Sequence, residues 1–243
     1  MLLAVSRIPE GSDTRLKAAQ AAGLALADLN RRLAGILPRV LFAGGAPAGL
    51  DQALAALGFG VLALEPTEVP DDDQRVVVRR LDFSGGALTA WDAQGKEHRA
   101  SGPDIGLLQR GMRVSRNTQT VKTSERKLDV GRAVLSGGLL LTKKVEKTDV
   151  KTTETSEPFL LVQRRGDSDL ILYERRIDYR ALGAEMQPAS RGNLEVVWRK
   201  LGALAPDRVD DRVARPGFVT GLPATSADPV DLALALVALD RQR

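Results

Sequence analysis

The chain has 243 residues, enough for one large domain or two small ones that each bury a core. Hydrophobic residues make up 43% and charged residues 27%, as in ordinary globular proteins, but aromatic residues make up only 4%, so the core must be mostly aliphatic. The lack of cysteine excludes disulfides and thiolate catalysis, and the single histidine excludes a histidine-clustered metal site within one chain.

Positive charge is concentrated in the second part of the sequence. Residues 1–74 hold 6 Lys+Arg against 9 Asp+Glu, whereas residues 75–243 hold 29 against 22. This asymmetry predicts two units and places any anionic partner on the second. Residues 1–9 do not resemble a secretory signal, and no segment approaches about 18 consecutive apolar residues, so we expect a soluble cytoplasmic protein.

Apolar runs separated by turn residues predict a small α/β domain over residues 1–66. Its helical part shows apolar positions at spacings of three and four and is divided by Gly23-Leu24. The expected elements are a strand at 2–8, two helices within 16–33, a strand at 39–43, a helix at 50–57 and a strand at 61–64. The predicted order is therefore βααβαβ.

Two segments of this domain carry a resemblance to a known family. AAQAAGLALADL, with Gly23-Leu24 between two helices, and ALAALGFGVLAL, which runs through Gly58 into the last strand, resemble the C-terminal domain of the bacterial ribosomal stalk protein. The resemblance implies the fold of this domain. In that family a lysine-rich helical face recruits translation GTPases, whereas the matching face here is largely Ala and Gln, with Arg15 and Lys17 as its basic residues.

A β domain is predicted over residues 75–204, after a polar linker whose Asp71–Asp73 run we interpret as solvated. Gly166 supplies the turn of a hairpin, and an amphipathic helix follows near 191–204. The expected strands are 76–83, 87–92, 97–100, 105–114, 159–163 and 170–173. Residues 205–243 form a C-terminal extension, with a short amphipathic helix after Asp228-Pro229 whose apolar face is formed by Leu232, Leu236 and Leu239.

The order of these elements resembles a bacterial pleckstrin-homology-like domain. The resemblance implies an antiparallel β-sandwich or barrel, closed at one end by the amphipathic helix, and it rests on element order without a sequence motif. The overall prediction is an α+β chain in which the small α/β domain precedes this β domain.

Residues 115–156 are predicted to be a long insertion in the β domain. Its segment 120–153 holds 8 Lys+Arg against 4 Asp+Glu, and the alternation in VEKTDVKTTE fits an exposed β-ribbon. An apolar centre lies between the basic flanks. The predicted binding residues are Lys122, Arg126, Lys127, Arg132, Leu139, Leu140, Leu141, Lys143, Lys144 and Lys147.

No catalytic, cofactor or metal signature is found in the sequence. Gly44-Gly45 and Gly137-Gly138 belong to neither GxGxxG nor GxxxxGK[ST], and Ser136 lies in LSGG instead of GxSxG. His98 lies in a charged hairpin and is expected at the surface. The carboxylate runs at Asp71–Asp73 and Asp210-Asp211 lie in loops, without the apolar surroundings that general acid–base catalysis requires.

These observations predict a non-enzymatic binding or scaffold module without cofactor or metal, acting through another protein or self-association at the insertion. An apolar centre flanked by charge is costly to expose without a partner. The alternative is peripheral binding of an anionic membrane through the same basic residues. Nucleic-acid binding is disfavoured because no aromatic residues interleave the basic ones. An enzyme with an unrecognised site ranks third.

Overall fold

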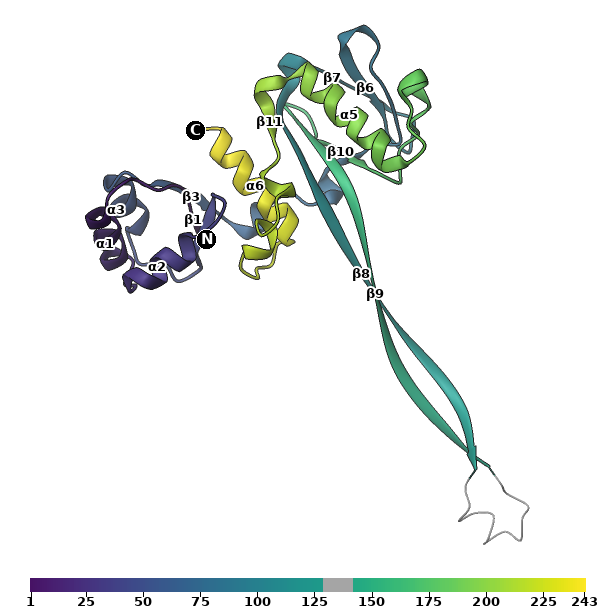
Figure 1. The fold of residues 1–243 in the computed structure, drawn as a ribbon, viewed down its shortest axis with the longest axis horizontal. Coiled ribbons are helices and arrows are strands. Elements are labelled where there is room, and N and C mark those ends of the chain that lie inside the picture. Colours follow the sequence, from purple (N-terminus) through teal and green to yellow (C-terminus); the bar gives the residue numbers. More distant parts are fainter. Residues whose placement is uncertain (129–141) are drawn as a thin grey trace. The chain divides into compact units, whose positions relative to one another are not determined.

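The computed structural model describes the backbone of residues 1–128 and 142–243 and the side chains of residues 1–114 and 154–243 (Figure 1). The chain divides into two compact units, of which Met1–Arg113 and Pro158–Arg243 form the first and Val114–Glu157 the second. The chain combines helices with several mainly antiparallel sheets, which confirms the predicted α+β class. Within the described ranges, no helix combines the length and the apolarity that a bilayer crossing requires.

The first part of the chain has the predicted βααβαβ order. Its elements are β1 Leu2–Arg7, α1 Ser12–Ala21, α2 Leu26–Leu33, β2 Arg39–Ala43, α3 Leu50–Ala56 and β3 Gly60–Leu64. β1 is the central strand and pairs antiparallel with both β2 and β3. Leu3 and Val5 of β1 belong to the same buried cluster as Leu29 of α2 and Leu54 of α3, so the helices cover one face of this sheet.

The other face of the same sheet is covered by the last helix of the chain, α6 Pro229–Arg241. Leu2, Ala4 and Leu62 form a buried cluster with Leu232 and Leu236 of α6. Other residues of α6, Ala233, Leu234 and Val237, belong to a separate cluster with β8, β9 and β10. The sequence predicted a single apolar face for this helix, but it is buried on two sides.

Residues 76–210 form two further sheets. Their strands are β4 Val76–Val77, β5 Arg80–Asp82, β6 Ala87–Trp91, β7 Glu97–Ser101, β8 Ile105–Leu128, β9 Thr142–Arg164, β10 Leu170–Tyr173 and β11 Val209–Asp210. One sheet has the order β11-β8-β9-β10-β4 and the other the order β5-β6-β7, and neither closes on itself. Gly166 adopts a φ of 74° in the turn between β9 and β10, which confirms its predicted role.

The strand expected at 76–83 is divided between the two sheets. β4 pairs with β10, whereas β5 pairs with β6, and the chain bends at Val78 and Arg79 to pass from one sheet to the other. Such a bend is the usual way for a strand to turn the corner of a sandwich. Both sheets contribute to one core, which α5 Ser190–Leu204 completes with Leu194, Val197 and Leu201.

Two edge pairings are parallel, although the sequence predicted an antiparallel arrangement throughout. β4 pairs with β10 at Leu170 and Ile171, and β11 pairs with β8 at Leu108 and Gln109. A strand and its parallel neighbour need a long connection between them, and helix α5 lies in the connection from β8 to β11. Both parallel pairings are short, because each joins only two residues of one strand to two residues of its neighbour.

β8 and β9 are far longer than the other strands, with 24 and 23 residues, and lie side by side as a two-stranded ribbon in Figure 1. β10 contacts β9 only at Phe159–Val162, and β11 contacts β8 only at Leu108–Gln109. Among the strands that the structure describes, the stretches Val114–Leu128 and Thr142–Glu157 therefore have only each other as neighbours.

Candidate functional site

The predicted binding residues lie outside the side chains that the structure describes. Lys122, Arg126 and Lys127 fall in β8, and Lys143, Lys144 and Lys147 fall in β9, so only their backbone is described. Arg132, Leu139, Leu140 and Leu141 fall in residues 129–141, which are not described. The binding site proposed from sequence therefore stays a prediction. What the structure does describe is the charged cluster where β8 leaves the first unit.

Arg113 of β8 is the centre of this cluster. Its Nη1 lies 2.7 Å from Oδ1 of Asp228, and its Nη2 lies 2.6 Å from Oδ1 of Asp72 and 2.9 Å from Oδ1 of Asp231. The Arg113 side chain is only 12% exposed. Its guanidinium also lies 5.7 Å from the ring centre of Phe159 in β9, at cation–π distance. One cation thus joins β8 to three carboxylates from other segments.

Arg75 repeats the same pattern from the linker before β4. Its Nη1 lies 2.8 Å from Oδ1 of Asp72 and 2.5 Å from Oδ1 of Asp231, and its Nη2 donates to the carbonyl oxygen of Pro70 at 2.7 Å. The side chains of Arg75 and Asp231 are 3% and 5% exposed. We call Asp72, Arg75, Arg113, Tyr173, Asp228 and Asp231 the root cluster.

Tyr173 of β10 closes the root cluster through a hydrogen bond from its hydroxyl to Asp72. Burial raises the pKa of the Asp72 carboxyl, but the hydrogen bond from Tyr173 and the charges of Arg113 and Arg75 outweigh burial and hold this pKa below 3.8. Burial and the bond to Asp72 raise the pKa of Tyr173 to about 12. Burial lowers the pKa of Arg113. The hydrogen bond to Asp231 and the charges of Asp231 and Asp72 outweigh burial, so this pKa is raised above its ordinary value.

Local sequence places the acidic members of the root cluster. Asp228 is the N-cap of α6 and accepts hydrogen bonds from the backbone N–H groups of Val230 and Asp231, as Asp228-Pro229 predicted. Asp72 begins a short 3₁₀ helix capped by Asp71. The interpretation of the Asp71–Asp73 run as solvated was therefore wrong for Asp72, because Arg75, three residues later, and Arg113 of β8 both pair with it.

Close packing of β8 against β9 and β10 supports the root cluster from the apolar side. The rings of Phe159 and Tyr173 are 6.2 Å apart. A Cβ atom at Gly111 of β8 would lie 2.8 Å from Cζ of Phe159 and 3.2 Å from Cγ1 of Val213. The strand therefore needs glycine at position 111, although the sequence alone did not explain why this residue lies within an expected strand.

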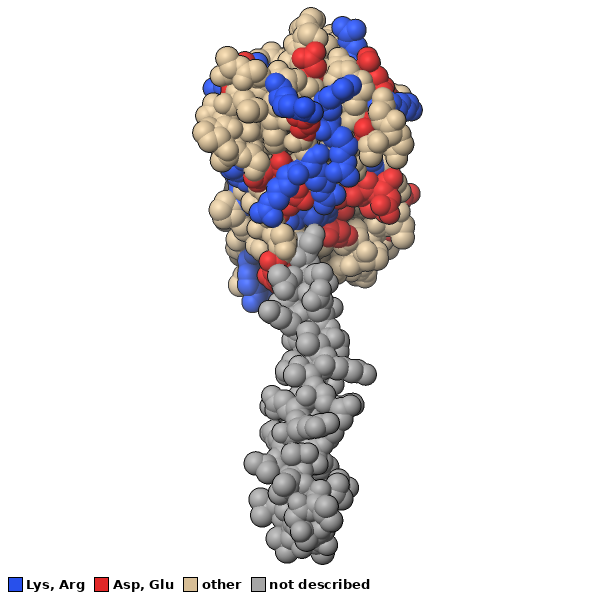
Figure 2. All heavy atoms as spheres, turned by 90° about the vertical axis from the view of Figure 1, so that its right-hand side faces the viewer, with Lys and Arg blue, Asp and Glu red and all other residues tan. Residues whose placement is uncertain are grey.

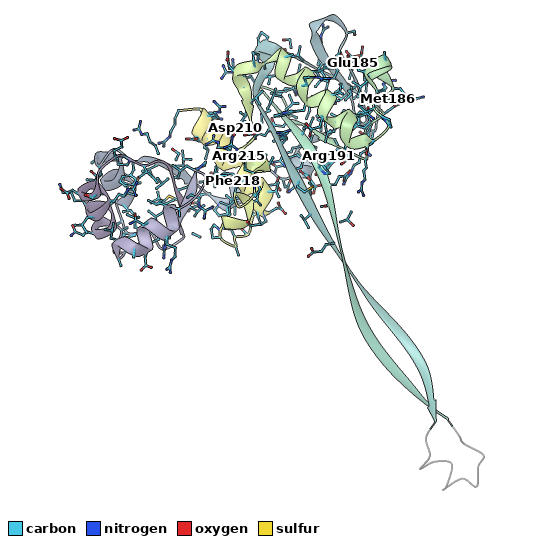
Figure 3. All side chains as sticks on the ribbon, viewed as in Figure 1. Glu185, Met186, Arg191, Asp210, Arg215 and Phe218 are labelled. Carbon is cyan, nitrogen blue, oxygen red and sulfur yellow. The ribbon has the colours of Figure 1, made fainter. Side chains whose placement is uncertain are left out.

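A second charged cluster fastens the end of α6 to β11. Asp210 is 2.8 Å from Nη2 of Arg212 and 2.9 Å from Nε of Arg241, and Arg212 also pairs with Asp240 at 2.6 Å. Burial raises the pKa of Asp210, but both arginines outweigh this effect and lower it. Figure 3 shows Asp210 and Arg215 on the segment between α5 and α6. The Asp210-Asp211 run is thus part of an ion-pair network.

His98 is buried, contrary to the expectation of a surface position. It is 7% exposed, and its Nε2 lies 3.1 Å from Oδ2 of Asp92 at the other end of the β6–β7 turn. Burial alternates along Glu97–Ser101, because successive side chains of a strand point to opposite faces of the sheet. His98 therefore lies on the buried face, although the hairpin is charged. In the described ranges, no three His, Asp or Glu side chains gather in a way that could hold a metal ion.

Comparisons of the chain with protein-family models, with curated proteins and with solved structures find no match. Sequence analysis missed the root cluster as a unit, although its signals were present in the Asp71–Asp73 run and in the Asp228-Pro229 cap. Arg113 and Tyr173 offered no separate signal, because each lies in an ordinary strand pattern.

Proposed function

We propose that the chain is a non-enzymatic, cytoplasmic protein-binding module and that the β8–β9 ribbon is its contact surface. The observation that supports this proposal is the length of the ribbon beyond its last neighbours. From Val114 to Leu128 and from Thr142 to Glu157, neither strand has a third strand beside it among those described. A ribbon with two open edges offers backbone N–H and C=O groups to a strand of another protein.

The energetics of an isolated ribbon support the same proposal. A two-stranded hairpin is at best marginally stable in water by itself, and three strands or a covered face are usually needed. At about 3.3 Å per residue, the 24 residues of β8 would extend over about 80 Å, much longer than the usual strand. A chain that retains such a ribbon gains stability when a partner strand or a second copy pairs with it.

The root cluster fits this role because it anchors the part of β8 that lies in the first unit. Arg113 is the last residue of β8 in the first unit, and it binds carboxylates from the linker and from α6. An interaction held by several buried ion pairs is rigid compared with a single surface pair. The cluster thereby acts as a structural support in the proposal, and the ribbon itself makes the contact.

The charge of the first unit suggests the character of the partner. Lys and Arg side chains gather in a band on the face shown in Figure 2, with Asp and Glu side chains at its margins. A partner with an acidic surface would complement this band and would associate faster at low salt. The peripheral-membrane alternative depends on the side chains of residues 120–153 and is separated from protein binding by the experiment.

The test compares the full chain with a variant lacking residues 120–153. Sedimentation velocity over a range of concentrations measures self-association, and quantitative affinity capture measures binding of other proteins. We expect the full chain to self-associate or to capture a defined partner, and we expect both properties to disappear with the deletion. Leu139→Asp with Leu141→Asp should weaken the contact more than Lys143→Glu with Lys144→Glu.

Flotation with lipid vesicles tests the membrane alternative. Binding to anionic but not neutral vesicles, lost at high salt and on Lys143→Glu with Lys144→Glu, would replace the protein-binding proposal. A deletion variant with the same oligomeric state and the same captured proteins as the full chain would refute a role of the ribbon.

A further inference from the structure

A cavity of about 660 Å³ lies in the first unit, between the end of β3, the inner parts of β8 and β9, and helix α6. This volume lies within the range of small-molecule binding sites, which are usually preformed and partly apolar. Its wall shares Arg75 with the root cluster but otherwise consists of different residues. The proposed protein contact makes no use of this cavity.

One side of the cavity is apolar. Leu64 of β3, Leu107 of β8, and Leu234 and Leu239 of α6 line it, together with the small side chain of Ala235. Ala235 and Leu239 are only partly buried, so the existing cores do not fully cover this side. An aliphatic chain placed against these residues would remove more apolar surface from water.

Charged side chains dominate the rest of the cavity wall. The charged residues that line the cavity are Glu68, Arg75, Arg164, Arg165, Asp169, Arg208 and Arg241. Three of the five arginines already have carboxylate partners: Arg75 with Asp72 and Asp231, Arg164 with Asp167, and Arg241 with Asp210. Arg165 and Arg208 are exposed and form no ion pair with any residue in the described ranges.

Two buried donors in the same wall also have no partner. Nη2 of Arg164 and Nε of Arg75 make no hydrogen bond within the part of the chain that the structure describes. These side chains are only 2% and 3% exposed. Buried N–H groups nearly always have an acceptor, which can be an ordered water or a bound ion. Both side chains line the cavity, so an anion bound there would lie beside these donors.

We propose that this cavity binds a single-chain amphipathic anion, a carboxylate on an aliphatic tail. Arg165 and Arg208 supply the charge for the carboxylate, since guanidinium groups bind carboxylates in a planar, often bidentate geometry. Leu234 and Leu239 contact the tail. Neither a bare anion nor a neutral alcohol satisfies both halves of the wall.

Isothermal titration of the full chain with decanoate, below its micellar concentration, tests the proposal. Decanol lacks the charge, sodium phosphate lacks the tail, and phosphatidylglycerol vesicles present the anion on a lipid surface. We expect decanoate to bind at one site per chain and more tightly than decanol or phosphate. Arg165→Glu with Arg208→Glu should weaken this binding by at least about tenfold, because charged hydrogen bonds are lost.

Two further variants locate the site. Ala235→Trp should fill the cavity and abolish decanoate binding, and Leu239→Trp serves the same purpose if the first variant fails to fold by circular dichroism. Arg15→Glu with Lys17→Glu makes the same total change of charge at two exposed positions of helix α1, which do not line the cavity, and should leave binding unchanged.

Several results would overturn the proposal. These are no binding of decanoate, equal binding by the filled variant, equal affinity for decanol or phosphate, and binding of vesicles without binding of decanoate.

Discussion

At the scale of single residues, Gly111 and the root cluster show how distant segments decide what a position tolerates. Gly111 has no side chain because Phe159, 48 positions later in the chain, occupies the space where its Cβ would lie. Asp72 is held by Arg75, Arg113 and Tyr173, of which only Arg75 is near in sequence. Such requirements cannot be seen in a sequence window, because the groups that impose them come from other strands.

Gly111→Ala is expected to destabilise the protein by about 1–3 kcal/mol, since the added methyl group overpacks a core contact. Chemical denaturation followed by circular dichroism measures this change. Combining Gly111→Ala with Phe159→Leu should recover part of the loss, because the shorter side chain leaves room for the methyl group. Two losses that simply add would show that the two positions do not interact.

Tyr173 should make the protein sensitive to alkaline pH. Its folded-state pKa of about 12 lies above the ordinary value of 10.0, so the folded state binds this proton more tightly than the unfolded state does. The contribution is complete below about pH 10 and is lost as the pH rises toward 12. Tyr173→Phe should flatten the dependence of the unfolding free energy on pH in this window. An unchanged slope would mean that the hydroxyl titrates normally.

At the scale of elements, strands and helices with strong local signals were predicted closely. The boundaries of β2 and β10 agree with the prediction, and α5 begins within one residue of the expected helix. The division of residues 76–83 into β4 and β5 was not predicted, because both halves are apolar enough for a strand and the bend depends on which sheet each half joins. Pairing between strands distant in sequence, including both parallel edges, left no local trace.

The ion pairs should contribute differently to the free energy of unfolding, according to how deeply their carboxylates are buried. Asp231→Asn leaves Arg75 and Arg113 without their shared buried carboxylate, and we expect a loss of about 3–5 kcal/mol. Asp211→Asn removes the exposed partner of Arg215 and should cost less than about 1 kcal/mol. Denaturation of both variants beside the parent at one salt concentration makes the comparison. Equal losses would contradict a special role for the root cluster.

At the scale of the whole molecule, α6 is the element whose packing the sequence predicted least completely. The predicted short amphipathic helix of a C-terminal extension has apolar residues in two separate cores. Periodicity indicated Leu232, Leu236 and Leu239 as one stripe, but Ala233, Leu234 and Val237 are buried as well. The candidate binding residues of the insertion could be chosen from charge and pattern, but their side chains lie outside the described residues, so their role stays a prediction.

Leu232→Ala should therefore weaken the contact of α6 with β1 and β3, two strands that are far from α6 in the sequence. The change removes a fully buried side chain that packs on β1 and β3, with an expected cost of about 2–5 kcal/mol. Hydrogen exchange should rise in β1 and β3 as well as in α6. Faster exchange confined to residues 229–241 would show that the two parts of the first unit are stable independently of this contact.

The burial of α6 on the first sheet also has a consequence for biosynthesis. Leu2, Ala4 and Leu62 leave the ribosome well before α6, the helix that covers them. Until then, this face of the nascent sheet is an apolar surface exposed to water, of the kind that chaperones bind. Synthesis of α6 ends that exposure, so a translation pause or a truncation before residue 229 would leave an aggregation-prone intermediate.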